Sequence, residues 1–200
     1  MKKVVTRLIF AISFMFTSMV NANVILSLDP TTQASHQGDT VSVTLMIDGL
    51  GDFNPLSLSF FDINIEFDTS ALSFAGYNLF NDLGDVGFFE ALDFSFGNLG
   101  GGLVNISEQS LFSNFDLWNF QPGSFALAEL FFVVDAPVIS TLSIDRAELV
   151  DVNGDTINII EANSASVTAV PTPATSVLMC IALLTMFVRK KYNPLGINKP

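Results

Sequence analysis

Three groups of residues have the types and spacing to bind a ligand. The first is a row of oxygen-bearing side chains, Asp62, Asn64 and Glu66, at alternate positions of one predicted strand. Alternate residues of a strand lie about 6.6 Å apart on one face, so the row could hold a cation or contact a sugar. A row of this kind is more often a solvated sheet face, which is the favoured alternative.

The second group lies in a short loop. Asp151, Asn153 and Asp155 place oxygen ligands at alternate positions, as calcium-binding loops do. The Gly and Glu that an EF-hand carries at its sixth and twelfth positions are absent. Asn153-Gly154 is also a standard pair for a tight hairpin turn, so a turn is favoured over a calcium site. Calcium is the one cofactor that the sequence offers.

The third group is aromatic. Phe115, Trp118 and Phe120 flank Asp116 and Asn119. An exposed aromatic platform beside amides can stack on sugar rings. The favoured alternative is that these rings fill the core, as most aromatic residues do.

Residues that catalysis usually needs are scarce. His36 and Cys180 are the only histidine and cysteine of the chain, and Cys180 lies in a C-terminal apolar run. Neither a Ser-His-Asp triad, nor thiol catalysis, nor a zinc site is supported. No pair among the 20 acidic residues has the context of a glycosidase pair. The sequence therefore predicts a protein that is not an enzyme.

The elements that must position these groups are β-strands. Val41, Val43, Leu45 and Ile47 alternate with polar residues and Met46, which predicts a strand with one buried face. The alternation in residues 58–67 changes phase at Phe60-Phe61, which predicts a bulge. Residues 125–134 are apolar at both parities, as in a central strand covered on both faces. Further strands are predicted at 24–28, 71–75, 103–107, 141–149, 156–160 and 164–168. About nine strands and no long helical period predict an all-β sandwich or jelly roll.

Charge is distributed very unevenly along the chain. All 20 acidic residues lie between Asp29 and Glu161, whereas seven of the eight basic residues lie in the terminal segments. Arg146 is the only lysine or arginine between them. Such a surface repels phosphate backbones, so a nucleic-acid partner is not expected. Divalent cations or basic partners fit better, and acidity alone also keeps a protein soluble.

The N-terminal residues have the layout of a secretory signal peptide. A basic start is followed by an apolar stretch at 8–20 and by small or short side chains that end in Ala22. This order predicts a signal peptide at 1–22, with cleavage between Ala22 and Asn23. The domain that remains, 23–169, contains no cysteine, so it must fold without a disulfide.

The C-terminal residues have the layout of a sorting signal, at 170–191. An apolar run at 174–188 would form a helix of about 22 Å, a marginal span for a hydrocarbon core of ~30 Å. The basic residues after it predict a cytoplasmic tail at 192–200 and a domain that faces out. The motif and the basic cluster consist of Val170, Pro171, Thr172, Pro173, Ala174, Thr175, Arg189, Lys190 and Lys191.

This segment resembles the PEP-CTERM sorting signal of Gram-negative bacteria, in which a Val-Pro-Glu-Pro-like motif precedes a transmembrane helix and an Arg-rich end. Thr172 stands where that family has glutamate, and residues 192–200 extend past the basic cluster. The resemblance implies recognition by an exosortase, a membrane thiol enzyme that cleaves near the motif. It also implies a transient anchor in the inner membrane, followed by release to the envelope, surface or extracellular matrix.

The domain between the two signals resembles the cohesin-like domains of the carbohydrate-binding-module superfamily. The resemblance is carried by Gly38-Asp39-Thr40-Val41, by the segments 61–74 and 123–132, and by the closing turn at 149–155. Residues 77–121 match nothing in that family. The resemblance implies a cohesin-like β-sandwich of about nine strands between the signal peptide and the transmembrane sorting helix.

Three functions are compatible with this reading. The first is a non-enzymatic module that binds carbohydrate, such as an exopolysaccharide. The second is a cohesin proper, which would dock a dockerin-bearing, polysaccharide-degrading enzyme. A polysaccharide hydrolase is the least favoured, because the sequence lacks a catalytic context.

Overall fold

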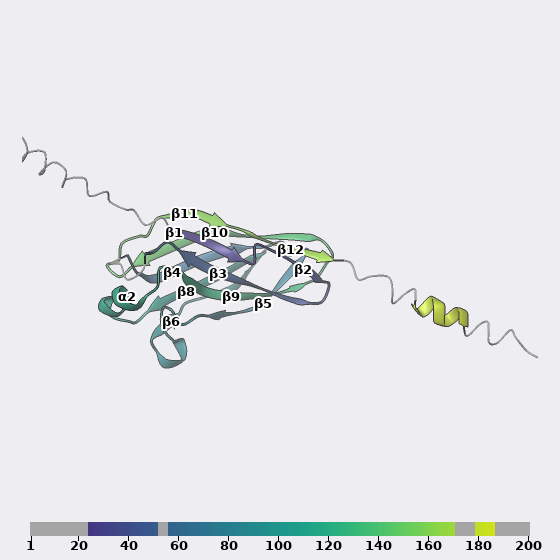
Figure 1. The fold of residues 1–200 in the computed structure, drawn as a ribbon, viewed down its shortest axis with the longest axis horizontal. Helices are drawn as coiled ribbons and strands as arrows, with labels where there is room; N and C mark the ends of the chain where they lie inside the picture. Colours follow the sequence, from purple (N-terminus) through teal and green to yellow (C-terminus); the bar gives the residue numbers. More distant parts are fainter. Residues whose placement is uncertain (1–23, 52–55, 171–178, 187–200) are drawn as a thin grey trace, which may run out of the picture.

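Two β-sheets pack face to face in the computed structural model, which describes residues 24–51, 56–170 and 179–186 (Figure 1). The first sheet has the strand order β11-β1-β3-β9-β5, with bounds Ile159–Asn163, Val24–Asp29, Thr40–Asp48, Phe125–Val134 and Leu72–Leu79. The second has the order β2-β12-β10-β4-β8-β6, with bounds Thr32–His36, Ala165–Val170, Ile139–Asp151, Leu58–Glu66, Leu103–Ser110 and Ala91–Asp93. A further strand, β7 (Gly97–Gly100), also pairs with β8.

A single apolar core lies between the two sheets, and all its buried residues fall between Val24 and Ala169. The predicted alternation in β3 is confirmed, because Val43, Leu45 and Ile47 are fully buried. Each such side chain stabilises the fold by about 1.5–3 kcal/mol relative to exposure in water. Phe132 of β9 packs edge to face on Phe67, with ring centroids 5.2 Å apart. The domain contains no cysteine, so this core takes the place of disulfides.

The predicted bulge in β4 is confirmed, although it lies one residue before the predicted phase change. Leu58 pairs with Asp151 and Phe60 pairs with Val150 of β10, which leaves Ser59 as the extra residue. The Ser59 hydroxyl donates to the carbonyl of Val150 at 3.1 Å and to that of Asp151 at 2.6 Å. After the bulge, the odd-numbered residues of β4 face the core and the even-numbered ones face outward.

The described residues contain twelve strands rather than the predicted nine or so. β2 was missed because all its residues except Ala34 are polar and none is buried; it pairs in parallel with β12. β6 and β7 are only three and four residues long and fall in the segment that matched no family pattern. The strand predicted at 156–160 begins later, at Ile159, and pairs in parallel with β1.

The prediction that residues 125–134 are covered on both faces was wrong. β9 does lie inside its sheet, between β3 and β5. However, only one of its faces reaches the core, and Ala126, Glu129, Phe131 and Val133 on the other face are half-buried. An apolar residue on the outer face of a sheet is common, because much of any protein surface is apolar.

The predicted terminal signals fall mostly outside the described residues. Those outside are the signal peptide with Ala22 and Asn23, the motif residues 171–175, and the basic cluster 189–191. Val170 is the last residue of β12, and residues 179–186 of the sorting segment form a helix. Within the described stretches, no helix combines the length and apolar content that a membrane crossing needs.

Gln121 fixes the position of a short helix, α2 (Asn114–Phe120), against the start of β4. The Gln121 Oε1 accepts the backbone N–H of Leu58 at 2.7 Å, and its Nε2 donates to the Leu58 carbonyl at 2.9 Å. The Gln121 residue is only 5% exposed, so both bonds are made away from water. At the other end of α2, the Ser113 hydroxyl accepts the backbone N–H of Asp116 and caps the helix.

We predict that Gln121→Ala lowers the free energy of unfolding by about 2–4 kcal/mol, because it leaves two buried backbone groups unpaired. Urea denaturation measures this change. Gln109→Ala is the control, since Gln109 is exposed on β8, and it should alter stability by less than about 0.5 kcal/mol. Equal losses in the two variants would contradict the role given to Gln121.

Candidate functional site

The row Asp62, Asn64 and Glu66 lies on the outer face of the second sheet. β4 is flanked there by β8 and β10, so cross-strand neighbours extend the row on both sides. Asn64 pairs with Asn105 of β8 and with Arg146 of β10. Asp62 pairs with Ser107 and with Glu148. The row lies on a sheet face, with Asp62 and Asn64 half-buried and Glu66 exposed, and the neighbouring strands extend it into a surface. Ligand binding by this face, as opposed to simple solvation, stays a prediction.

Asn105 organises the centre of this surface. Its Nδ2 donates to Asp62 Oδ1 and to Asn64 Oδ1, the latter at 2.9 Å. Its Oδ1 accepts the backbone N–H of Phe96 at 3.1 Å. This last bond fixes which way the amide points, because a carbonyl oxygen must face an N–H and the NH₂ must then face the carboxylate. Asn105 is 4% exposed and holds Asp62 and Asn64 in place from the neighbouring strand.

An ion pair borders the row on β10. Arg146 Nη2 lies 3.0 Å from Glu148 Oε2, and both side chains are about half exposed. An exposed pair of this kind contributes little to stability, about 0–1 kcal/mol. It does place both signs of charge beside the row. We call the surface the polar face and define it by Asp62, Asn64, Glu66, Gln109, Arg146 and Glu148, together with the buried Asn105 on the same side of the sheet.

An apolar edge runs along the polar face at β6 and β7. Leu92 pairs with Gln109, and the backbone N–H of Phe94 donates to the Ser107 carbonyl at 2.9 Å. Leu92 shares the outward side of the sheet with its partner Gln109, whereas Phe94 and Phe96 follow β6 in a segment without strand structure. Leu92, Phe94 and Phe96 are 38%, 49% and 81% exposed. Polar groups held in place beside exposed aromatic rings are typical of binding surfaces.

The loop with Asp151, Asn153 and Asp155 forms a turn. Asp151 Oδ1 accepts the backbone N–H groups of Asn153 and Asp155, both at 2.8 Å, and Oδ2 accepts Asn153 Nδ2 at 3.0 Å. Gly154 has φ 88°, which favours glycine. The Asp151 carboxylate is thus engaged by its own loop, as the turn alternative requires. Among the described residues, no group of three or more His, Cys, Asp or Glu side chains is placed to hold a metal. Calcium binding stays a prediction.

The aromatic residues of α2 do not form one flat platform. Phe115 and Phe120 are 67% and 71% exposed, whereas Trp118 is half-buried. At 3.6 residues per turn, Phe120 points about 160° away from Trp118 around the helix axis. The Trp118 Nε1 is buried and has no hydrogen-bond partner in the described part of the chain. Sugar stacking on these three rings stays a prediction, and the helix separates them.

A buried carboxyl group was missed by the sequence analysis. Glu108 of β8 pairs with Phe61 and with Asp93, so it shares the inward side of the sheet. It is 0% exposed, and neither of its carboxyl oxygens has a partner among the described residues. Burial, together with the charges of Asp93 and Asp82, raises the pKa of Glu108 to about 8. A signal existed, since Glu108 directly follows the strand predicted at 103–107 and continues the parity of Val104 and Ile106.

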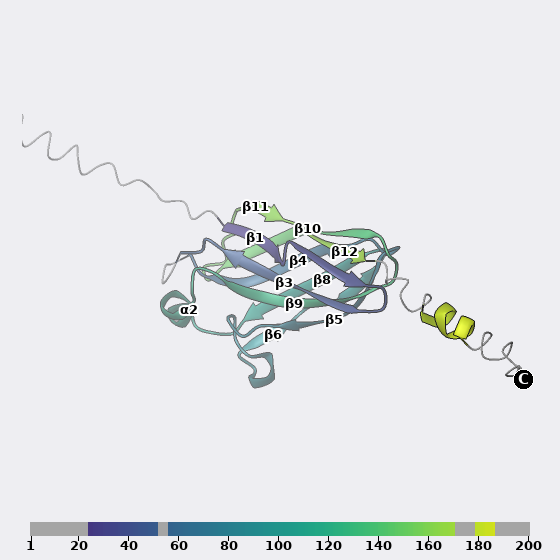
Figure 2. The ribbon, with the colours of Figure 1, turned by 45° about the vertical axis from the view of Figure 1, so that its right-hand side comes forward.

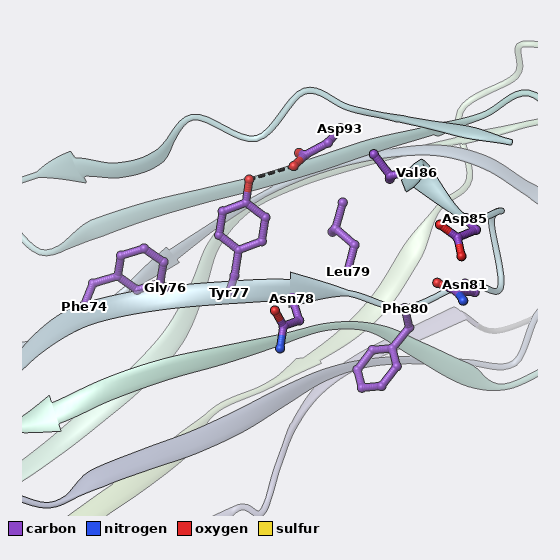
Figure 3. Close-up of a pocket in the computed structure, with 10 residues that line it drawn as sticks. All are labelled: Phe74, Gly76, Tyr77, Asn78, Leu79, Phe80, Asn81, Asp85, Val86 and Asp93. Atoms are coloured by element: carbon purple, nitrogen blue, oxygen red, sulfur yellow. Dashed lines mark hydrogen bonds between the residues drawn. The ribbon is translucent and has the colours of Figure 1, made fainter. Parts of the chain in front are cut away.

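Asp93 also closes the open side of the sandwich, where the edge strands β5 and β6 face each other (Figure 3). Tyr77 Oη donates to Asp93 Oδ2 at 2.8 Å and so bridges the two sheets. Burial, and then the bond to Asp93, raises the pKa of Tyr77. A hollow of about 530 Å³ lies beside this bridge, between β5 and the turn that contains Val86.

The architecture matches that of solved cohesin modules. The CaCohA2 module of Clostridium acetobutylicum, determined in solution, is 21% identical; the match covers 74% of this chain and 92% of that chain, with a TM-score of 0.58. The domain has a cohesin-like fold. The sixth cohesin of scaffoldin B from Acetivibrio cellulolyticus, solved in complex with a mutant Cel5 dockerin, is 14% identical over 74% of this chain and 99% of that chain (TM-score 0.58).

The same fold also occurs in a cohesin described as non-cellulosomal. A non-cellulosomal cohesin from the archaeon Archaeoglobus fulgidus is 12% identical over 80% of this chain and 98% of that chain, with a TM-score of 0.56. No protein-family model and no curated protein matches the sequence. The expectation of a cohesin-like sandwich is therefore confirmed at the level of the fold.

The buried Glu108 makes the stability of this cohesin-like domain depend on pH. The unfolded chain ionises a glutamate near pH 4.3, whereas the folded domain keeps Glu108 protonated until about pH 8. The folded state therefore loses stability as the pH rises through this window. We predict a loss on the order of a few kcal/mol between pH 5 and pH 8.

Urea denaturation at a series of pH values measures this loss. Glu108→Gln cannot ionise, so it should remove the decline and stabilise the domain at pH 8. Glu148→Gln is the control, because Glu148 is exposed on the polar face, and it should keep the wild-type decline. If Glu108→Gln loses stability as steeply as the wild type, Glu108 is not the group responsible.

Proposed function

We propose that this protein is a non-enzymatic binding module that docks a protein partner through the polar face. The proposal rests above all on the Asn105 network, which holds Asp62 and Asn64 in fixed positions before any partner arrives. Side chains that are already ordered lose little conformational entropy on binding, so more of the contact energy appears as affinity.

The cohesin-like fold supports a protein partner. Among the structures that this chain resembles are a complex of CaCohA2 with the CaDoc0917 module and the Coh-OlpA–Doc918 cohesin–dockerin complex of Clostridium thermocellum. A stable interface buries roughly 800 Å² on each partner. The exposed side chains of Leu92, Phe94 and Phe96 add apolar area to a contact centred on the polar face. The partner we propose for this chain is a protein module that carries complementary polar groups and an apolar patch.

Carbohydrate binding is the second candidate function. It is favoured by the exposed rings of Phe115 and Phe120 at the end of the sandwich. It is weakened by the half-buried Trp118, which leaves no continuous platform for sugar rings. A hydrolase is not proposed.

We also propose that the module is exported and sorted by an exosortase-type enzyme. Support comes from the sequence of the two terminal segments and from one feature of the fold: β12 ends at Val170, directly before the proline motif. Cleavage after this point would leave every strand of the sandwich intact. The proposed location is the envelope, surface or matrix of a Gram-negative bacterium, with a transient stay in the membrane.

Docking through the polar face predicts a loss of binding in the double variant Asp62→Ala/Asn64→Ala. The full chain is immobilised, and host proteins that it retains are identified by mass spectrometry and then titrated individually. Removal of these two ordered side chains should lower the affinity for the retained partner by about 30-fold or more. Glu161→Gln is the control, because Glu161 is exposed on β11 in the other sheet, and it should bind as the wild type does. Unchanged affinity in the double variant would overturn the proposal, and saturable binding on a glycan array instead would favour the second candidate.

Sorting predicts two processing steps in the native host. Intact mass measurement should find an N-terminus at Asn23 and a C-terminus within residues 170–175. In the variant Pro171→Ala/Pro173→Ala, protein with an unprocessed C-terminus should accumulate. The control variant Pro194→Ala, beyond the basic cluster, should be processed normally. A mature protein that retains residues 176–200 would contradict exosortase cleavage.

A further inference from the structure

A second hollow lies at one end of the sandwich, beside α2. It measures about 390 Å³ and is formed where the chain after β5 meets the segment around α2. A backbone bond from Leu111 N–H to the Glu90 carbonyl, 2.8 Å long, ties these two parts of the chain together. Figures 1 and 2 show α2 at the opposite end of the domain from the tip of β12. We call this site the α2 hollow.

The walls of the α2 hollow are largely apolar. Phe112, Leu117 and Phe120 line it, together with Pro122. Leu117 is buried, whereas Phe120 is 71% exposed and stands at the rim. The volume lies within the range of small-ligand pockets, about 300–1,000 Å³. The hollow can therefore accept one long, apolar stem, such as an extended side chain.

A carboxylate without a partner lies in these walls. Asp82 is half-buried, and in the described part of the chain its carboxylate makes no hydrogen bond and no ion pair. Burial raises the pKa of Asp82. The second carboxylate of the hollow, Asp116, is different, because the Ser113 hydroxyl donates to it at 2.6 Å. Asp82 is thus a negative group that the domain itself leaves unsatisfied.

Glu108 is buried near this end of the domain, and because it stays protonated until about pH 8 it adds no negative charge to the hollow. It feels the charge of Asp82, and both of its oxygens are without partners among the described residues. No lysine or arginine of the described domain pairs with the Asp82 carboxylate. Arg146 is the only lysine or arginine in the described domain, and it pairs with Glu148 on the polar face. A cationic group of a binding partner would supply the opposite charge that the described domain lacks beside Asp82.

We propose that the α2 hollow receives a single arginine or lysine side chain of a partner protein. The aliphatic stem packs against Phe112, Leu117 and Phe120, and the cationic head meets the Asp82 carboxylate at the wall. The aromatic rings add attraction, because a cation over a ring face is favourable by about 0.5–1 kcal/mol at exposed sites. A long basic side chain is the natural occupant, since it joins an apolar stem to a charged end.

Other occupants fit less well. A metal ion needs several oxygen ligands, and no such group was found among the described residues. A neutral sugar has no positive charge to pair with the Asp82 carboxylate. The inference does not depend on the polar face, which is built from different residues.

The single tryptophan of the chain provides the readout. Trp118 lies on α2 between Leu117 and Phe120, which both line the hollow. N-acetyl-arginine amide is titrated into the full chain while the emission of Trp118 is recorded. N-acetyl-norleucine amide, which has an apolar stem and no charge, and cellobiose serve as comparison ligands. We expect saturable binding of the arginine derivative. The affinity for the norleucine derivative and for cellobiose should be lower by about fivefold or more.

Two carboxylate variants locate the contact. Asp82→Asn keeps the shape of the side chain and removes the charge. It should therefore lower the affinity for the arginine derivative by about fivefold or more. It should not unfold the domain, because burial already disfavours the charged form of Asp82. Asp62→Asn, on the polar face, should bind the arginine derivative as the wild type does.

Several results would overturn the proposal. They are the absence of a saturable response to the arginine derivative, equal affinity for the norleucine derivative, or an equal affinity of Asp82→Asn and the wild type. Saturation by cellobiose in the absence of a response to arginine would assign the hollow to a sugar. Loss of arginine binding in Asp62→Asn would move the cation site to the polar face. None of these outcomes bears on whether the polar face docks its own partner.

Discussion

The register of β4 between β8 and β10 determines both the core and the polar face. Ile63 and Ile65 are fully buried because Asp62 and Asn64 point the other way, and Ser59 sets this phase as the extra residue of a bulge. A slip of one residue would place a carboxylate and an amide in the core and two isoleucines in water. Burial of each isoleucine is worth about 1.5–3 kcal/mol, so the same energy that folds the domain fixes the binding surface.

The excess of acidic residues has a structural use. Asp39, Asp68, Asp85, Asp93 and Asp151 each accept a backbone N–H from a residue close in sequence, and so close five loops or strand ends. Aspartate does this in turns because its short carboxylate reaches the backbone two residues on. The bond from the His36 N–H lowers the pKa of Asp39, and the bonds from the Ser70 hydroxyl and then from its N–H lower the pKa of Asp68. Five of the 20 acidic residues thus organise loops, whereas the carboxyl groups of Asp82 and Glu108 are partly or fully buried without a hydrogen-bond partner among the described residues.

The sequence predicted the strands that alternate and missed the elements that do not. β3, β4 and β8 each have one apolar parity, and each lies where the alternation placed it. β2 is polar except at Ala34, and β6 is too short to show a period, so neither left a signal. The face of the Asp62 row followed from β4 alone. The role of Asn105 did not, because it depends on pairing between residues 41 and 43 positions apart. The α2 hollow likewise exists only where two distant segments meet.

Docking through the polar face requires that β4, β8 and β10 contact the partner. The most direct measurement is a map of backbone and side-chain amide chemical shifts in the ¹⁵N-labelled protein, with and without the retained protein partner. The account predicts that the shifts change at the side-chain amide of Asn64 and along β4, β8 and β10, while β1, β3 and β9 are unaffected. Changes confined to β1, β3 and β9 would contradict docking through the polar face.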